Sequence, residues 1–394
     1  MKLPAPEWTR SAGGAALLMA LDASDGTTRL VGGAVRDSLL GLAGADIDLA
    51  TRLAPAEVMR RLAAAGIKAV PTGLAHGTVT AISAGITAEV TTLRRDVATD
   101  GRHAEVAFTD DWCEDASRRD FTINALYATL PDCEISDFFG GLDDLQAGRV
   151  RFIGEPLQRI AEDHLRILRF FRFSARFART VDAEGLAACT ARANDLMALS
   201  RERIAGEMRG LLGVPDPLPI VTLMLDHGIF KPVLPEIPHD RLPVLARTIA
   251  AEAATGIMPD WRRRLAALLP SDATIAEAVG RRLRLSNADR IRIARAVVPH
   301  HGAALFAAAW KLGAEAVADR LLISGDAGPN AAAVLAWQRP RVPVSGRDLL
   351  ARGLMPGPQV AARLAVFENA WVAAGFPGDA ATVTILLDRA VADT

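Results

Sequence analysis

The chain has 394 residues, half of them hydrophobic, and a formal net charge of −1 at neutral pH. This length allows two or three domains with apolar cores, and no apolar run approaches the roughly 18 residues that a membrane-spanning helix needs. A near-neutral chain has no global field that attracts nucleic acid, so any RNA contact must come from local patches.

Cysteine usage and the N-terminus bear on the compartment. Cys113, Cys133 and Cys189 are scattered, without the spacing of a metal site or a disulfide framework. The apolar run over 15–21 is short and follows charged residues, so no signal peptide is expected. These features predict a protein of the reducing cytoplasm.

Residues 1 to about 150 alternate between strand and helix patterns. Apolar runs between turn residues predict strands at 29–31, 46–49, 76–82 and 86–93. Helices are predicted from near Gly33, over 55–65 and over 118–127. Residues 94–117 are polar and charged, which predicts a mobile loop of the kind that is often functional.

From about residue 156 onward the chain is predicted to be helical. Apolar periodicity is strongest over 157–177 and 201–212. Prolines cluster at 215–219 and 232–238, which indicates boundaries there. The helices beyond them are rich in alanine, leucine and arginine and contain no recognisable chemical motif.

Two aspartates carry the most informative chemistry. On a strand, Asp46 and Asp48 point to one face while Ile47 points into the core. Neighbouring carboxylates repel each other unless a cation lies between them, and Mg²⁺ with a bound triphosphate fits that need. An isolated pair can also be a solvated turn or a helix cap, but the apolar alternation through Ile47 and Leu49 favours a strand beside a cleft.

A glycine turn precedes this aspartate pair. Gly32 and Gly33 let the backbone approach a phosphate closely, and Arg36 and Asp37 follow on the next predicted helix. Alone, such a turn is most often only a tight turn, and neither the Walker A pattern nor the dinucleotide fingerprint is present. Its position before the aspartates favours triphosphate binding, with Arg36 as a charged contact.

Glu89 is the candidate third carboxylate. It shares a strand face with Thr87 and Thr91, where it could join the aspartates. It is explained equally well as a salt-bridged residue of an edge strand.

The segment 118–126 places polar residues against an apolar stripe. Asp120 and Asn124 are one helical turn apart, so both can reach one ligand. An Asp with an Asn suits a ribose hydroxyl, and Arg119 suits a phosphate. The spacing alone would also describe a charged first turn of a surface helix.

The segment 162–173 combines an acid with several arginines. Asp163 and Arg166 are neighbours on the predicted helix and could imitate a base-pairing edge, although an ordinary intrahelical ion pair has the same spacing. Arg166, Arg169 and Arg172 follow one side of this helix and predict an anionic partner.

Five segments in this order resemble the motifs of the class II tRNA nucleotidyltransferase and bacterial poly(A) polymerase family, in the polymerase β-like nucleotidyltransferase superfamily. The segments are 30–48, 118–126, 137–145, 162–172 and 199–207. The resemblance spans 29 to about 212, roughly half of the chain.

The resemblance implies an α/β head, with a polymerase β-like sheet and helices, followed by an all-α neck, body and tail. We expect a catalytic nucleotidyltransferase head over 1–150 and a neck for base recognition over 151–215. A helical body and tail that bind tRNA are expected over 216–394.

It also implies a site for Mg²⁺ and for the substrates CTP and ATP. Asp46 and Asp48 would hold the metal, Gly33, Arg36 and Arg119 the triphosphate, Asp120 the ribose, and Asp163 and Arg166 the base edge. Arg169 and Arg172 would support the base readers or touch phosphate. The loop over 94–111, with Asp100 and Arg102, would be flexible and needed for the change from C to A.

The implied activity is template-independent addition of C, C and A to the 3′ end of tRNA, with no membrane or stable protein partner. Residues 71–80 resemble the CCA-adding branch. A poly(A) polymerase, an enzyme that adds only CC or only A, and a non-catalytic RNA-binding protein with the same fold remain alternatives.

Overall fold

The computed structural model describes residues 1–42, 46–99, 104–299, 304–325 and 328–392. The chain forms two compact units, Met1–Val233 and Leu234–Thr394. The finer division predicted at 150 and 215 stays a prediction.

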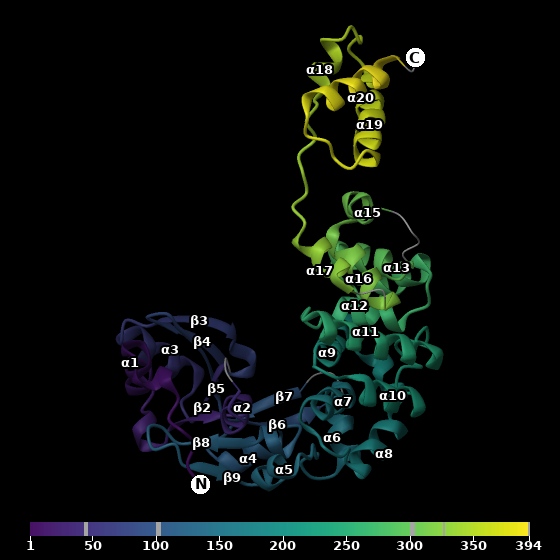
Figure 1. The fold of residues 1–394 in the computed structure, drawn as a ribbon. Coiled ribbons are helices and arrows are strands. Elements are labelled where there is room, and N and C mark those ends of the chain that lie inside the picture. Colours follow the sequence, from purple (N-terminus) through teal and green to yellow (C-terminus); the bar gives the residue numbers. More distant parts are fainter. Residues whose placement is uncertain (43–45, 100–103, 300–303, 326–327, 393–394) are drawn as a thin grey trace. The chain divides into compact units, whose positions relative to one another are not determined.

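The first unit is built on a seven-stranded mixed sheet with the order β3-β4-β5-β2-β1-β8-β9 (Figure 1). Its strands are β1 Thr28–Val31, β2 Ile47–Thr51, β3 Lys68–Gly73, β4 Thr78–Ser83, β5 Ile86–Thr92, β8 Leu126–Ala128 and β9 Ile135–Asp137. β2 and β5 pair in parallel, whereas the other neighbours are antiparallel. This parallel pair holds the carboxylates that the sequence singled out.

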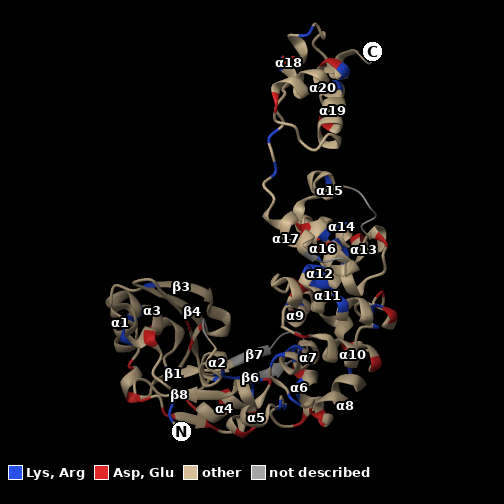
Figure 2. Ribbon diagram, viewed as in Figure 1, with Lys and Arg blue, Asp and Glu red and all other residues tan. Residues whose placement is uncertain are grey.

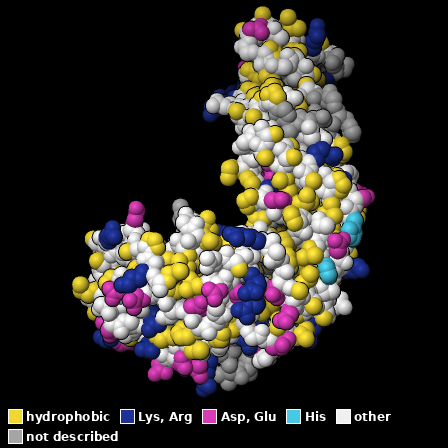
Figure 3. All heavy atoms as spheres, turned by 60° about the horizontal axis from the view of Figure 1, so that its bottom comes forward, with side chains coloured by type: hydrophobic (Ala, Val, Ile, Leu, Met, Phe, Trp, Pro, Cys, Tyr) yellow, Lys and Arg dark blue, Asp and Glu magenta, His cyan; other side chains and the backbone are white. Residues whose placement is uncertain are grey.

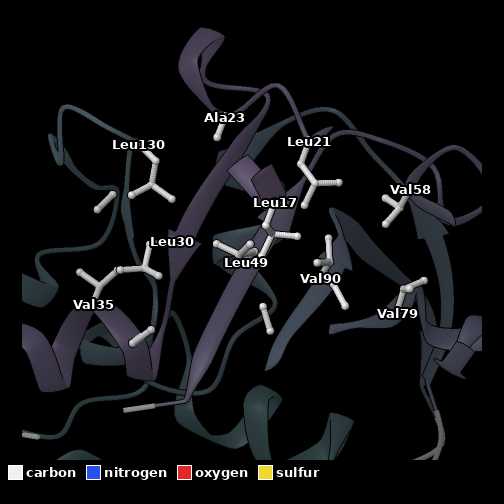
Figure 4. Close-up of a cluster of buried hydrophobic side chains, with 14 of the residues drawn as sticks. Leu17, Leu21, Ala23, Leu30, Val35, Leu49, Val58, Val79, Val90 and Leu130 are labelled. Carbon is white, nitrogen blue, oxygen red and sulfur yellow. The ribbon is translucent and has the colours of Figure 1, made fainter. Parts of the chain in front are cut away.

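One face of the sheet is covered by helices. These are α1 Ala12–Ala20, α2 Gly33–Leu39 and α3 Pro55–Ala64. Leu17, Val35 and Val58 from the three helices are buried in one cluster with Leu49 and Val90 from the parallel strands (Figure 4). Because strand neighbours alternate, Asp48 lies on the opposite face from Leu49.

The opposite face is covered in part by the short helix α4, Trp112–Ser117. Trp112 and Ala116 are buried with Val31, Ala50 and Tyr127 of the sheet. The rest of this face carries polar and charged residues, among them Asp48, Glu89 and Thr91.

Helices follow the sheet to the end of the first unit. They are α5 Gly141–Ala147, α6 Pro156–Glu162, α7 Leu165–Phe177, α8 Ala183–Ala191, α9 Arg201–Leu212 and α10 Leu218–Asp226. Phe170 and Phe171 of α7 are fully buried, and the ring of Phe170 stacks on Phe152 at 5.5 Å between centroids. The same helix carries a run of basic residues (Figure 2).

The described part of the second unit is helical. Its helices are α11 Leu242–Thr255, α12 Trp261–Leu268, α13 Ala273–Arg282, α14 Asn287–Ala296, α15 Leu305–Leu312, α16 Ala314–Ser324, α17 Gly328–Ala336, α18 Gly346–Leu350, α19 Pro358–Ala373 and α20 Ala380–Ala392. Val317 and Leu322 belong to one apolar cluster, and Phe367 and Trp371 to another. Buried Asp319 accepts hydrogen bonds from Arg263 and Arg292.

Charge is not segregated at the surface seen in Figure 3, where basic, acidic and apolar side chains are interspersed. Within the described residues, the helices are all too short or too polar to cross a bilayer.

The prediction of a loop over 94–117 is wrong for its described residues. β6 Arg94–Thr99 and β7 Ala104–Phe108 pair as an antiparallel hairpin, and α4 follows. The predicted loop residues Asp100 and Arg102 lie outside the described residues. The hairpin forms its own two-stranded sheet, so its sequence needs no alternating apolar face, and Asp111 caps α4 at Cys113 N.

The prediction of a helix over 118–127 is also wrong. Phe121 is extended and bridges to Phe152, residues 122–124 form one 3₁₀ turn, and β8 begins at Leu126. The apolar residues of the segment 118–127 are buried, but they do not form one stripe along a helix. β3 and β9 are further strands that the sequence pattern did not predict.

The helix predicted over 157–177 is two helices that meet at Asp163. Asp163 has extended backbone dihedrals, and its Oδ1 accepts the Leu165 N–H, which starts α7. The Asp163 side chain caps α7 and so stabilises the break between the two helices. The apolar periodicity is present on both sides of the break, which is why the pattern predicted one helix. The predicted Asp163–Arg166 pairing on one helix is therefore replaced by other partners.

Candidate active site

A cleft of about 690 Å³ opens in the first unit, over the sheet face that carries Asp48. Its walls come from the turn after β1, strands β2, β4 and β5, the segment 118–124, and helices α6, α7 and α9. The predicted residues that line it are Gly32, Gly33, Arg36, Asp48, Glu89, Arg119, Asp120, Asn124, Asp163, Arg166 and Arg169. Asp37, Asp46 and Arg172 are outside the lining that the described residues form.

The carboxylates lie at the ends of the parallel pair. Asp48 on β2 and Glu89 on β5 are register partners, while exposed Asp46 precedes β2. Burial raises the pKa of Asp48, and Glu89 and Asp46 raise it further, to about 6, against the opposing effect of Arg119 and Arg36. Uncompensated negative charge of this kind is relieved by a cation.

Mg²⁺ fits this donor set. Within the described residues, no three His, Cys, Asp or Glu side chains converge as a ready metal site. Mg²⁺ does not require such a cage, because it commonly binds one or two carboxylates together with substrate phosphates and waters. Asp48 and Asp46 are the residues that could provide the carboxylates.

The glycine turn makes room for a guanidinium. Gly32 has φ +64° and ψ −122°, and a Cβ there would lie 3.3 Å from Arg119 Nη1. Arg119 itself is fixed by its Nε on the Tyr127 hydroxyl at 3.1 Å and its Nη2 on Asp115 at 3.0 Å. Arg119 and the Gly32 turn therefore lie side by side in the cleft.

Arg36 is held more tightly than the sequence suggests. Its guanidinium donates to Asp37 at 2.7 Å and to the Asn124 side chain, and it packs over the Phe177 ring at 4.3 Å. Burial lowers the pKa of Arg36, although Asp37 opposes that effect. The hydrogen bond between Arg36 and Asn124 therefore links α2 to the 3₁₀ turn over 122–124 at the cleft wall.

Asp120 is paired with Arg169 of helix α7. Its Oδ2 accepts from Arg169 Nε at 2.7 Å, and its Oδ1 accepts from Asn124 Nδ2 at 2.9 Å. Burial alone would raise the pKa of Asp120, but Arg169 and the Asn124 hydrogen bond outweigh it and lower that pKa. The predicted Asp120–Asn124 proximity is present, without the predicted helix.

Asp163 and Arg166 face the cleft with separate partners. Asp163 Oδ2 accepts from Arg203 Nη2 at 2.7 Å, on α9. Arg166 Nη1 donates to Glu162 at 2.6 Å and to the Arg159 carbonyl, and its Nη2 donates to the Arg118 carbonyl at 2.8 Å. Three of the five guanidinium donors are thereby engaged.

Arg172 turns to α9. Its Nε donates to Glu207 at 2.6 Å, and its stem fills the space beside Gly210, where a Cβ would lie 2.4 Å from Arg172 Cδ. This contact holds α7 against α9, and the expectation that Arg172 supports the base readers or touches phosphate stays a prediction.

Several lining residues were not singled out from the sequence. They are His76, Thr78, Thr91, Arg94, Arg118, Glu162 and Arg203. Arg203 lies in the fifth motif-like segment, but its spacing gave no indication that it reaches Asp163, 40 residues earlier.

Comparisons with known proteins show the family to which the chain belongs. The family model described as the poly A polymerase head domain matches residues 28–151, and the model described as the probable RNA and SrmB-binding site of polymerase A matches 180–240. The CCA tRNA nucleotidyltransferase 1, mitochondrial, of Mus musculus is 33% identical over 373 residues, which cover 88% of this chain and 83% of that protein.

Bacterial relatives extend the likeness over the whole chain. The CCA-adding enzyme of Levilactobacillus brevis is 30% identical over 89% of this chain and 90% of its own length. The solved structure of the Bacillus stearothermophilus CCA-adding enzyme in complex with CTP matches 96% of this chain and 98% of its own, with 26% identity and a TM-score of 0.75. This chain belongs to the family of CCA tRNA nucleotidyltransferases.

Proposed function

We propose that this protein adds C, C and A to the 3′ end of tRNA, taking CMP twice from CTP and AMP once from ATP. The observation that carries the proposal is one cleft that holds a carboxylate pair, an arginine beside a glycine turn, and Asp163 before α7 with Arg166 in its first turn. The family membership supports the same activity.

In each cycle the terminal 3′ hydroxyl of the tRNA attacks the α-phosphate of the nucleotide. A new P–O bond forms, the bond to the β-phosphate breaks, and pyrophosphate leaves with its electron pair. Mg²⁺ held by Asp46 and Asp48 would acidify the hydroxyl and neutralise charge on the phosphates. Arg119 and the Gly32 turn fix the triphosphate in line with the hydroxyl.

Base choice follows from hydrogen-bond direction. Cytosine and adenine both place an amino donor next to a ring-nitrogen acceptor, and they match a carboxylate acceptor at Asp163 and a guanidinium donor at Arg166. Uracil and guanine present the reverse pattern and would leave buried polar groups unpaired. No nucleic-acid template is needed.

The proposed reaction also suggests roles for the remaining site residues and for the domains. Asp120 and Asn124 would select the ribose, and Glu89 would assist the metal aspartates. Residues 1–150 would be the catalytic head, 151–215 the neck, and 216–394 the tRNA-binding body and tail. Scattered cysteines support a reducing compartment, and we propose the cytoplasm.

The test is incorporation read at single-nucleotide resolution. The protein is incubated with Mg²⁺ and a tRNA that ends before CCA, with CTP, ATP or both, beside a reaction with excess EDTA. The proposal requires two C residues with CTP alone, one further A with both, and no product with EDTA. A long A tail with ATP alone would instead identify a poly(A) polymerase.

A further inference from the structure

Asp115 on α4 is a buried carboxylate to which the reaction above gives no part. Its side chain is 1% exposed, yet it lies directly behind two arginines that line the cleft. A carboxylate buried at this depth needs full compensation by charge and hydrogen bonds. Its partners therefore show what its position stabilises.

Each oxygen of Asp115 has a separate set of donors. Oδ1 accepts from Arg118 Nε at 2.9 Å, from Arg118 Nη2 at 2.7 Å and from the Arg94 backbone N–H at 3.2 Å. Oδ2 accepts from Arg119 Nη2 at 3.0 Å and from the Tyr127 hydroxyl at 2.6 Å. One carboxylate thus holds two guanidinium groups and the first residue of β6.

The Oδ2 side leads to the triphosphate end of the cleft. Arg119 donates from Nε to Tyr127 and from Nη2 to Asp115, so both bonds fix its plane. Nη1 is then left beside the Gly32 turn. A guanidinium in a fixed plane gives a phosphate a preformed donor pair.

The Oδ1 side leads to the base-reading end. Arg118 Nε also donates to the Arg94 carbonyl at 3.0 Å, and the Arg118 carbonyl accepts from Arg166 Nη2 at 2.8 Å. Arg94 pairs with Phe108 at the open end of the β6–β7 hairpin. Asp115 therefore accepts a hydrogen bond from the first residue of the hairpin. It is linked to Arg166 through Arg118, whose side chain donates to Asp115 and whose carbonyl accepts from Arg166.

We propose that Asp115 is a positioning residue for both ends of the nucleotide, holding Arg119 toward the triphosphate and, through Arg118, Arg166 toward the base. This inference rests on the proposed nucleotidyl transfer and assigns it one further specificity-determining position. Because the same carboxylate ties down the start of β6, the hairpin and the base-reading arginine are coupled through Asp115.

The decisive variant is Asp115→Asn, which keeps the volume and replaces one acceptor oxygen with an amide donor that faces its former donors. The matched control is Glu114→Gln, the preceding residue of α4, whose carboxylate accepts from Thr109 rather than from an arginine. Single-turnover addition to tRNA is measured with CTP and with UTP, and CTP binding is measured by calorimetry in the presence of Mg²⁺. Thermal unfolding establishes that each variant is folded.

For Asp115→Asn we expect KM for CTP to rise about tenfold or more and the preference for CTP over UTP to fall about tenfold, roughly one buried hydrogen bond for each effect. Glu114→Gln should keep the wild-type values. A folded Asp115→Asn protein with wild-type KM and wild-type base preference would overturn the inference, as would a loss of turnover with both quantities unchanged.

Arg118→Gln keeps Asp115 in place and covers the case in which Asp115→Asn does not fold. It should reduce the preference for CTP over UTP while leaving KM for CTP within about threefold of wild type, because the Arg119 bonds persist. An unchanged preference in this variant would also overturn the proposed coupling. If wild-type protein added no nucleotide, the proposed function would fail, and weaker CTP binding by Asp115→Asn would still support the role at Arg119.

Discussion

Asp48 and Glu89 are register partners on β2 and β5, so two carboxylates from different strands face the same cleft. Parallel pairing requires a crossover between these strands, and β2 reaches β5 through α3, β3 and β4. Asp48 and Glu89 are 41 positions apart in the sequence, which predicts a shared strand face for Glu89 but not this register.

Replacing Asp48 with Ala should lower the rate of C addition by roughly a thousandfold or more, since loss of a metal carboxylate removes several kcal/mol of transition-state stabilisation. Rapid-quench measurement of one CMP addition gives that rate. Thermal unfolding should show a folded protein, because the substitution removes repulsion from Glu89. Activity within tenfold of wild type would contradict the metal assignment.

Glu89→Gln separates the two readings of that residue. As a participant in metal binding, Glu89 should set the Mg²⁺ concentration for half-maximal rate, and the variant should need roughly ten times more. The matched control is Glu134→Gln, on an exposed carboxylate that forms an ion pair with exposed Lys2. The expected alternative of an edge strand is wrong, since β5 lies between β4 and β2. An unaltered Mg²⁺ titration would therefore exclude Glu89 from the metal site and leave it as a cleft-lining carboxylate.

The pair between Asp120 and Arg169 makes a second prediction. Removing either partner leaves a buried charge, so Asp120→Ala should destabilise the protein by about 3 kcal/mol in urea unfolding. Arg169→Met should cost at least as much, because it leaves Asp120, the more buried partner, without its cation. A double-mutant cycle should give a coupling of about 1–3 kcal/mol, and additive effects would contradict the pairing.

Much of the head could be predicted because local chemistry decided it. The strand at 28–31, the helix opened by Pro55 and the strand after Asp46 each combine a period with a start or stop residue, and the structure has them within a few residues. The segment 201–212 matches α9 for the same reason.

The elements that were not predicted from the sequence depend on tertiary contacts. β6 consists largely of polar residues, and β8 is buried on both sides, so neither shows strand alternation. Asp163 looked like a helical residue because the apolar pattern continues past it, whereas a cap interaction with Leu165 separates two helices. The contact of Arg203 with Asp163 and the contact of Asp115 with Arg119 became evident only from the fold.

Asp115 should also make stability depend on pH. Burial alone would raise its pKa, but Arg119 and Arg118 outweigh burial and hold the pKa below its ordinary value. The folded protein then binds fewer protons than the unfolded chain, so this stabilisation is fully present above about pH 5. It begins to decline as the pH falls through the ordinary aspartate range, and it is lost as the pH falls through the lowered pKa of the folded state.

Urea unfolding of wild type and Asp115→Asn at several pH values from 6.5 to 3.5 measures this effect. At pH 6.5 the variant should be less stable by about 3 kcal/mol, and the difference should shrink as the pH falls. Glu114→Gln should follow the wild-type curve. A difference that stays constant with pH would mean that Asp115 is not charged in the folded protein.

Arg203 on α9 should fix the direction of Asp163. Its guanidinium holds Oδ2 at 2.7 Å while Leu165 N–H holds Oδ1 at 3.0 Å, so the carboxylate cannot rotate without breaking one of these bonds. In Arg203→Ala the carboxylate keeps its backbone bond but loses its second anchor. We expect the preference for CTP over UTP to fall by roughly tenfold, which corresponds to one charge-assisted hydrogen bond, with a smaller change in the rate of CMP addition.

Arg209→Ala, on the last turn of the same helix and outside the cleft lining of the described residues, is the matched control. Competition between CTP and UTP in one reaction measures the preference directly, and an unchanged ratio in Arg203→Ala would show that Asp163 is held well enough by Leu165 alone.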